Sequence, residues 1–199
     1  MVAVAFHAES LFTLKALRTK FFPEWGLDWD KIRSSHREAT FNVYNFSKHS
    51  LRAVPAAELT EDLLVAAGSL PIWFPPVRIH GDTYIDAVLN IASNLEEAIR
   101  RGADELWVIW TTSTRGRWLS GFVGNFFGIF EATTNWTYKR DRARIEANNA
   151  AIERGESGEF ERRIVVRELK AEVALHYLSN FSKRRFPEAV ERGVAAARE

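Results

Sequence analysis

The amino-acid sequence predicts an α/β protein folded as a single domain over residues 1–199. Residues 106–110, Leu-Trp-Val-Ile-Trp, form a continuous apolar run of strand length, which is typical of a buried parallel strand. Residues 94–102, just ahead of them, carry the start and stop signals of a helix. A second strand pattern at residues 83–85 precedes that helix. Two strands on either side of a helix make an α/β unit, so these observations predict the class.

The composition excludes several classes of protein. The chain holds 27 basic and 26 acidic residues, so its net charge gives no bulk attraction to nucleic acid or to an anionic membrane surface. It has no cysteine, which excludes disulfides and thiolate metal sites, and its five histidines show no ligand spacing. We therefore predict no metal, no cofactor and no nucleic-acid partner.

The N-terminal segment has the signature of neither a signal peptide nor a spanning helix. No basic residues precede its apolar ones, and Glu9 and Lys15 interrupt it. We therefore expect a cytoplasmic protein, with peripheral contact at a membrane as an open alternative. Because the chain starts directly in a helical pattern, we also expect it to lack strands that normally begin an α/β domain.

Local patterns assign the first part of the chain. Apolar residues at helical spacing predict a helix over residues 8–22, and Pro23 is expected to stop it. A short turn and helix follow at residues 25–32. Residues 39–46 alternate and are rich in aromatic and β-branched side chains, which predicts a strand. Pro55 marks a loop.

Thr60 is the predicted N-cap of the next helix. Glu61 and Asp62 follow it and favour the positive end of the helix dipole. The helix is expected to end by Leu70, because Pro71 disfavours helical geometry in the residue before it.

A hairpin is predicted after the extended Pro75-Pro76 segment. Residues 77–79 and 83–85 flank a tight turn at Gly81–Asp82, and Gly at the first central position suits a type II′ turn. Asp86 comes directly after the second strand of the hairpin. A carboxylate at a strand end of an α/β sheet occupies a position where functional groups are often placed.

The central helix has a capping box in its sequence, with Asn94 as the cap and Glu97 three residues later. Gly102 follows two arginines at its end, which is the expected C-terminal order. Residues 106–110 then form the apolar strand.

Residues 118–130 are uncharged and strongly aromatic. They are too few to span a bilayer. We interpret them as a buried helix or a packed loop, and the alternative is an interfacial segment or part of an acyl pocket. Beyond them, the pattern predicts an amphipathic helix at residues 138–154, a strand at 163–169 and a closing helix at 187–198.

A serine nucleophile of the Gly-x-Ser-x-Gly type is absent from the chain. The nearest match, Gly155–Glu159, lacks the final glycine and lies in a charged loop with no strand before it. We therefore reject Ser157 as a nucleophile.

Residues 63–110 resemble the second half of the patatin-like phospholipase domain. The order and spacing of its motifs agree over about fifty residues, in three blocks. The matching residues are Ala67-Gly68 followed by Pro71 and Phe74-Pro75-Pro76, then Tyr84-Ile85-Asp86, then Ala98-Ile99 and Gly102-Ala103-Asp104 ahead of the apolar strand.

The resemblance implies a three-layer α/β/α sheet, here incomplete at its N-terminus. It also implies a lipid acyl hydrolase that cleaves carboxylic ester bonds with a Ser–Asp dyad and no cofactor. Asp86 falls on the dyad aspartate of the family, which makes it the one catalytic residue that the resemblance assigns. The implied partner is a lipid or another acyl-ester substrate.

The chain departs from the family pattern in two ways. The Gly-rich oxyanion loop and the nucleophile elbow are not in this sequence, and Ala87 and Val88 stand where the family has glycines. Three interpretations stay open. The chain is the Asp-bearing part of such a hydrolase, inactive alone and complemented by a nucleophile-bearing segment or chain. It is a non-catalytic module that binds lipid or a protein partner. Or it is an unrelated α/β domain in which the motif match is chance, which a structure without a parallel sheet leading into Asp86 would confirm.

Overall fold

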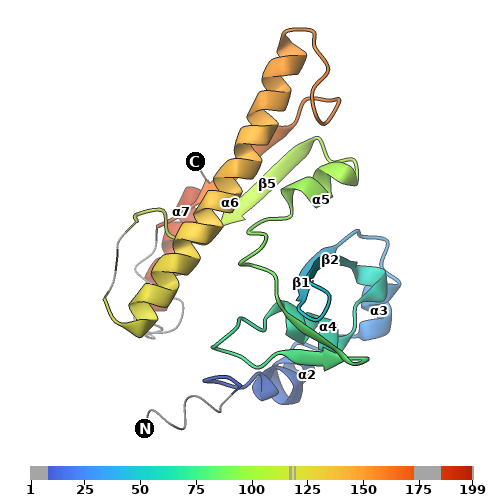
Figure 1. Cartoon of the computed structure of the whole chain (residues 1–199), viewed down its shortest axis with the longest axis vertical. Helices are drawn as coiled ribbons and strands as arrows, with labels where there is room; N and C mark the ends of the chain where they lie inside the picture. The colour runs from blue at the N-terminus through green and yellow to red at the C-terminus, as the bar shows by residue number, and fades with distance from the viewer. Residues whose placement is uncertain (1–8, 117, 119, 173–184, 199) are drawn as a thin grey trace. The chain divides into compact units, whose positions relative to one another are not determined.

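Figure 1 shows the computed structural model of the chain, which describes residues 9–116, 118, 120–172 and 185–198. The chain divides into two compact units, a first unit of Met1–Ser93 and a second unit of Asn94–Glu199. Each unit contains helices and a β-sheet. This mixture of helices and strands agrees with the predicted α/β class.

The helical elements described in the first unit are short. They are η1 (Leu17–Phe21, a π-helix), α2 (Phe22–Glu24), α3 (Trp29–Arg33), η2 (Ala56–Glu58, a 3₁₀-helix) and α4 (Glu61–Ala67). The helix predicted over residues 8–22 is wrong at both ends. Residues 9–14 are not helical, and Leu11 and Phe12 instead donate backbone hydrogen bonds to the carbonyls of Ile72 and Trp73. Pro23 does not stop the helix, because it lies in the first turn of α2, where no N–H is needed.

The sheet of the first unit is entirely antiparallel. Its strands are β1 (Thr40–Asn45), β2 (Ser50–Pro55), β3 (Val77–Ile79) and β4 (Asp82–Asp86), in the order β2-β1-β4-β3. The strand predicted at residues 39–46 is confirmed as β1. Strand β2 was missed, because Pro55 was interpreted as a loop residue. Proline is tolerated there since β2 lies at the edge of the sheet.

The β3–β4 hairpin is confirmed, but its turn is not the predicted one. Ile79 pairs with Asp82, so the two central residues of the turn are His80 and Gly81. Both have positive φ, 50° and 85°, which is the signature of a type I′ turn. The prediction placed the turn one residue too late, because it assumed that Gly81 takes the first central position.

Helix α4 packs against strands β1 and β4 and completes the core of this unit. The buried cluster consists of Val43, Val54, Leu59, Leu63, Ala66 and Tyr84. The predicted N-cap is confirmed, because the Thr60 hydroxyl accepts a hydrogen bond from the Leu63 N–H at 3.2 Å. Local capping and burial of one helix face therefore fix α4 on the sheet.

The second unit contains α5 (Leu95–Arg100), β5 (Glu105–Trp110), α6 (Phe122–Glu153), β6 (Val165–Lys170) and α7 (Arg185–Ala196). The segment at residues 118–130, interpreted as a buried helix or a packed loop, is helical from Phe122 onward. It is continuous with the helix predicted at residues 138–154 in one 32-residue helix, because residues 131–137 hold no glycine or proline that would end it. The predicted capping box of α5 does not form. Asn94 makes no side-chain cap bond, and Glu97 binds Arg100 and Arg101 instead.

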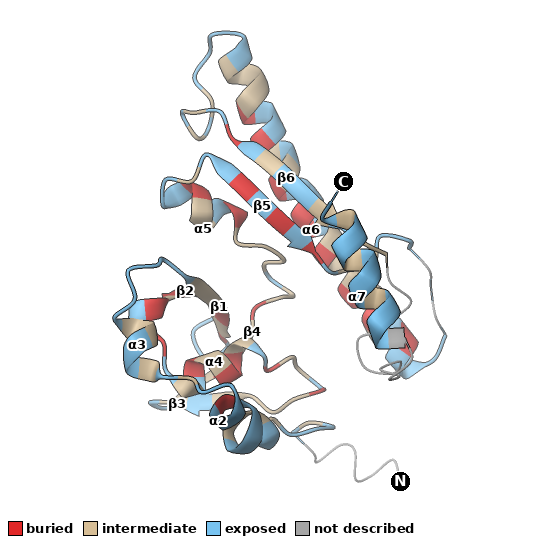
Figure 2. Ribbon diagram, turned by 180° about the vertical axis from the view of Figure 1, so that it is seen from behind, coloured by how far each residue is buried: buried red, intermediate tan, exposed pale blue. Residues whose placement is uncertain are grey.

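Strands β5 and β6 form a two-stranded parallel sheet, as the apolar run predicted for β5. The prediction that β5 is buried is wrong for one of its faces. Trp110 faces α6 and stacks on Tyr138, whereas Trp107 and Ile109 are 74% and 72% exposed. Figure 2 shows this alternation of buried and exposed residues along β5. Arg167 of β6 lies over the Trp107 ring at 5.4 Å.

We predict that this exposed apolar face drives self-association, because removing Trp107 and Ile109 from water is favourable. Sedimentation or light scattering across a concentration series should show the wild-type chain as oligomers. A Trp107→Lys/Ile109→Lys double variant should shift it to monomers, whereas Leu51→Lys, at an exposed apolar residue of β2, should not. A wild-type chain that stays monomeric at high concentration would contradict this prediction.

Candidate functional site

Asp86 is the last residue of β4, next to the end of α4. Its Cα pairs with that of Val43, and its N–H donates to the carbonyl of Ser69 at 3.0 Å. Because β4 is antiparallel to both β1 and β3, the strand that leads into Asp86 does not belong to a parallel sheet. Among the described residues, parallel pairing occurs between β5 and β6, in the second unit.

The carboxyl group of Asp86 is half-buried, and burial raises its pKa to about 6. One hydrogen bond, from the Val88 N–H to Oδ1 at 2.8 Å, opposes this shift by favouring the charged form. The same bond closes an Asx turn after β4. A carboxylate with a pKa near 6 is a stronger base than an exposed aspartate, so it is suited to accept a proton near neutral pH.

Ser69 is the hydroxyl-bearing residue whose backbone adjoins Asp86. Its side chain is fully buried and donates a hydrogen bond to the carbonyl of Val65 at 2.8 Å. The hydroxyl of Ser69 is thus bonded to a carbonyl of α4 and is inaccessible to a substrate. Ser69 is therefore not a candidate nucleophile.

The loop that follows Ser69 is strained and firmly held. Ile72 has a φ of 74°, which a β-branched side chain rarely adopts. Its carbonyl and that of Trp73 accept backbone hydrogen bonds from Leu11 and Phe12, and the Phe12 ring stacks on the Trp73 ring at 6.1 Å. The surrounding contacts therefore hold this backbone in an unfavourable conformation, as is often seen near functional sites.

Ala87 and Val88 follow Asp86 without backbone strain. The non-glycine residues with positive φ in the described part of the chain do not include them. Ala87 is 1% exposed, so its methyl group fills the space beside β4. The backbone after Asp86 is therefore one that L-residues adopt readily.

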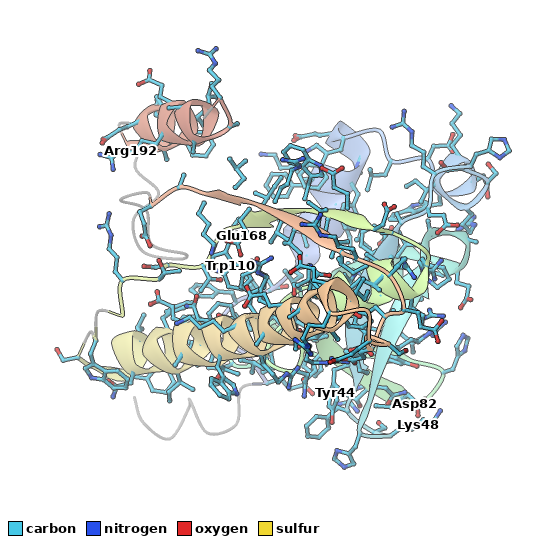
Figure 3. The ribbon with its side chains drawn as sticks, turned by 90° about the horizontal axis from the view of Figure 1, so that it is seen from above. Tyr44, Lys48, Asp82, Trp110, Glu168 and Arg192 are labelled. Atoms are coloured by element: carbon cyan, nitrogen blue, oxygen red, sulfur yellow. The ribbon has the colours of Figure 1, made fainter. Side chains whose placement is uncertain are left out.

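A charged pair forms at the start of the same strand, between Asp82 of β4 and Lys48 of the β1–β2 turn. Lys48 donates to Asp82 at 2.5 Å, and these two side chains are labelled in Figure 3. Asn45 donates to the same carboxylate at 3.0 Å. The hydrogen bond from Lys48 and then that from Asn45 lower the pKa of Asp82. Of the two carboxylates on β4, Asp86 is therefore the one whose charged form is destabilised.

The sequence analysis missed a polar cluster in the second unit. Tyr138 of α6 donates a short hydrogen bond to Glu168 of β6, and Lys170 and Arg142 lie within 2.8 and 3.6 Å of that carboxylate. Trp110 and Glu168 are labelled in Figure 3. Burial, and then the bond to Glu168, raise the pKa of Tyr138 well above its usual range. Pairing the two strands predicted at residues 106–110 and 163–169 could have suggested this cluster, because it places Glu168 near Trp110.

Two further findings concern the described residues only. No three histidines, aspartates or glutamates gather there as a metal-ligand set, and His7 and His176 lie outside that part of the chain. No helix in it is long and apolar enough to cross a membrane.

No family model matches the chain, and no curated protein matches it.

We predict that Asp86→Asn stabilises the folded protein at pH 8 by about 1 to 2 kcal/mol. The folded-state pKa of Asp86 lies above the unfolded value, so the folded protein binds this proton more tightly than the unfolded chain does. Stability is therefore lost as the pH rises from about 4 to about 6, and the loss persists above that range. Asparagine carries no charge and retains an oxygen for the Val88 N–H.

Urea unfolding at pH 4 and pH 8 measures this effect. The gain in Asp86→Asn should appear at pH 8 and vanish towards pH 4. The matched control is Asp82→Asn on the same strand, which should lose stability at pH 8, because the pKa of Asp82 is lowered by its hydrogen bonds from Lys48 and Asn45. Equal stability of Asp86→Asn and wild type at both pH values would show that the Asp86 carboxyl is not destabilised.

Proposed function

We propose that this chain is the Asp-bearing part of a patatin-like lipid acyl hydrolase, with Asp86 as the base of a Ser–Asp dyad. The observation that carries the proposal is the carboxyl group of Asp86, whose burial raises its pKa to about 6 at the end of a strand. The three motif blocks around it, in the order of the family, support the same assignment. Both supports are independent, since one is electrostatic and the other is a sequence pattern.

In the proposed reaction, Asp86 accepts the proton of a serine hydroxyl while the serine oxygen bonds to the ester carbonyl carbon. The carbon–oxygen bond to the leaving alcohol then breaks, and Asp86 returns the proton to that alcohol. Water cleaves the acyl-serine by the same steps in reverse order. The serine would come from sequence outside these 199 residues or from another polypeptide, because no Gly-x-Ser-x-Gly lies within them.

A non-catalytic module that binds lipid or a protein partner is the second candidate. The observation that favours it is the Asx turn, since Oδ1 of Asp86 already accepts the Val88 N–H and can serve a purely structural purpose. The fully buried Ser69 hydroxyl beside it points the same way. The antiparallel sheet around β4 meets the criterion stated above for the third candidate, an unrelated α/β domain.

We predict that the purified 199-residue chain does not hydrolyse p-nitrophenyl butyrate above the rate in buffer. A base without a nucleophile has nothing to activate. A spectrophotometric assay at pH 8 measures the rate. Turnover by this chain alone would contradict the prediction, and its loss in Asp86→Asn would in addition rule out the non-catalytic module.

The hydrolase proposal itself is tested on the DNA upstream of the Met1 codon. We expect that region to encode Gly-x-Ser-x-Gly, and the extended polypeptide to hydrolyse the ester. Asp86→Asn should lower its kcat by about 100-fold or more, whereas Asp82→Asn should leave kcat near the wild-type value. Unrelated upstream sequence would remove the serine from this polypeptide and leave only a second chain as its source. Full activity in Asp86→Asn would overturn the proposal.

A further inference from the structure

A groove runs along one face of α6 in the second unit, beside the segment that follows β5. Two cavities form it, of about 400 and about 250 Å³, and both are lined by Thr114, Asn135 and Lys139. Thr114 follows the carboxyl end of β5, and Lys170 at the end of β6 lines the smaller cavity. The carboxyl ends of parallel strands are where α/β proteins most often bind ligands. We call this feature the α6 groove.

Glu131 places an unpaired carboxylate in the larger cavity of the groove. Its side chain makes no hydrogen bond or ion pair with any residue that the structure describes. Burial, and then the negative charge of Glu172, raise its pKa. Glu172 is itself held in place, because it accepts hydrogen bonds from the Thr114 N–H at 2.9 Å and from the Ser113 hydroxyl at 3.3 Å. A cation beside Glu131 would relieve this unfavourable charge.

Lys139 places an unpaired ammonium group in the same cavity. Across residues 9–116, 118, 120–172 and 185–198 it has no ion-pair partner. The other two cations of the groove are occupied, since Arg142 binds Glu146 at 3.2 Å and Lys170 binds Glu168 at 2.8 Å. Glu131 and Lys139 are eight residues apart on α6, so their Cα atoms are separated by about 12 Å. The two side chains do not pair with each other in the structure.

Aromatic rings line the larger cavity together with Glu131. Trp136 and Trp118 are 68% and 64% exposed. The Trp118 ring lies directly over Gly128, where an added Cβ would come within 2.9 Å of ring atom Cζ3. Trp110, which lines the smaller cavity, is 8% exposed, and its indole N–H has no hydrogen-bond partner within the described part of the chain. Such rings provide faces that attract organic cations.

We propose that the α6 groove binds a small zwitterion, with its ammonium group beside Glu131 and Trp136 and its anionic group at Lys139. A simple cation would leave Lys139 unpaired, and a simple anion would be repelled by Glu131. A ligand that carries both charges satisfies the two unpaired groups at once. The proposal does not rest on Asp86 or on the proposed hydrolase, because the groove lies wholly in the second unit.

Nuclear magnetic resonance titration of the full chain with phosphocholine tests the proposal. The chain has seven tryptophans, and we expect selective shifts of the Trp136 and Trp118 indole N–H signals. The few contacts available suggest a dissociation constant of about 1 mM. Choline alone and inorganic phosphate alone should each bind at least about fivefold more weakly. No selective shift up to about 20 mM, or equal binding of choline and phosphocholine, would overturn the proposal.

Variants test the two charges separately. Glu131→Gln and Lys139→Gln should each weaken phosphocholine binding by about fivefold or more, whereas Glu153→Gln, at an exposed acid near the end of the same helix, should not change it. Thermal unfolding of each variant verifies that it is folded. Unchanged binding in both groove variants would overturn the proposal.

The source of the zwitterion is settled by a further comparison. Sedimentation with phosphatidylcholine vesicles, against phosphatidylglycerol vesicles, shows whether the groove accepts the headgroup of an intact lipid. Binding to phosphatidylcholine vesicles that free phosphocholine competes away identifies a lipid headgroup. Binding to free phosphocholine without vesicle binding identifies a soluble ligand, and either result supports the zwitterion site.

Discussion

The stack of Trp110 on Tyr138 holds the second unit together. The two ring centroids are 4.2 Å apart, and the stack ties α6 to the one parallel strand pair among the described residues. The hydrogen bond from Tyr138 to Glu168 adds β6 to the same contact. A two-stranded parallel sheet buries little surface by itself, so the position of this long helix over one face is what makes the unit compact. Both rings of this stack also line the smaller cavity of the α6 groove.

The same contact explains why the other face of the sheet is apolar and open. Side chains alternate along a strand, so placing Trp110 and Val108 under α6 necessarily turns Trp107 and Ile109 outward. Their hydrophobic character is typical of strands covered on both faces. The sequence of β5 is therefore that of a strand buried on both faces. In the second unit, however, helix α6 covers only one face of β5. Complementation by a further chain or a second copy would resolve this mismatch.

Local sequence signals predicted much of the fold. The features that were not predicted depend on the pairing of strands far apart in the sequence. Thr60 caps α4 and Gly102 follows α5 as expected, because caps depend on three or four neighbouring residues. Strand β2 was missed because Pro55 is compatible with a strand only at a sheet edge, which is a tertiary fact. The I′ turn at His80 was likewise set by the register of β3 against β4.

The candidate sites divide in the same way. Asp86 was identified from a linear motif, but its raised pKa follows from burial, which the sequence does not display. The α6 groove left no motif, because Glu131 and Lys139 acquire meaning only beside Thr114 and the end of β6.

Asp86 and Glu131 are both carboxyl groups with raised pKa values, yet their surroundings call for different partners. The pKa of Asp86 is raised by burial and opposed by a single backbone hydrogen bond, so a proton is the simplest species that relieves it. Glu131 also feels the charge of Glu172, and it shares its cavity with exposed tryptophan rings and Lys139. A proton would neutralise Glu131 but would make no contact with the tryptophan rings or with Lys139. The surroundings of Asp86 therefore suit a group that accepts a proton, and the surroundings of Glu131 suit the binding of a ligand that carries both charges.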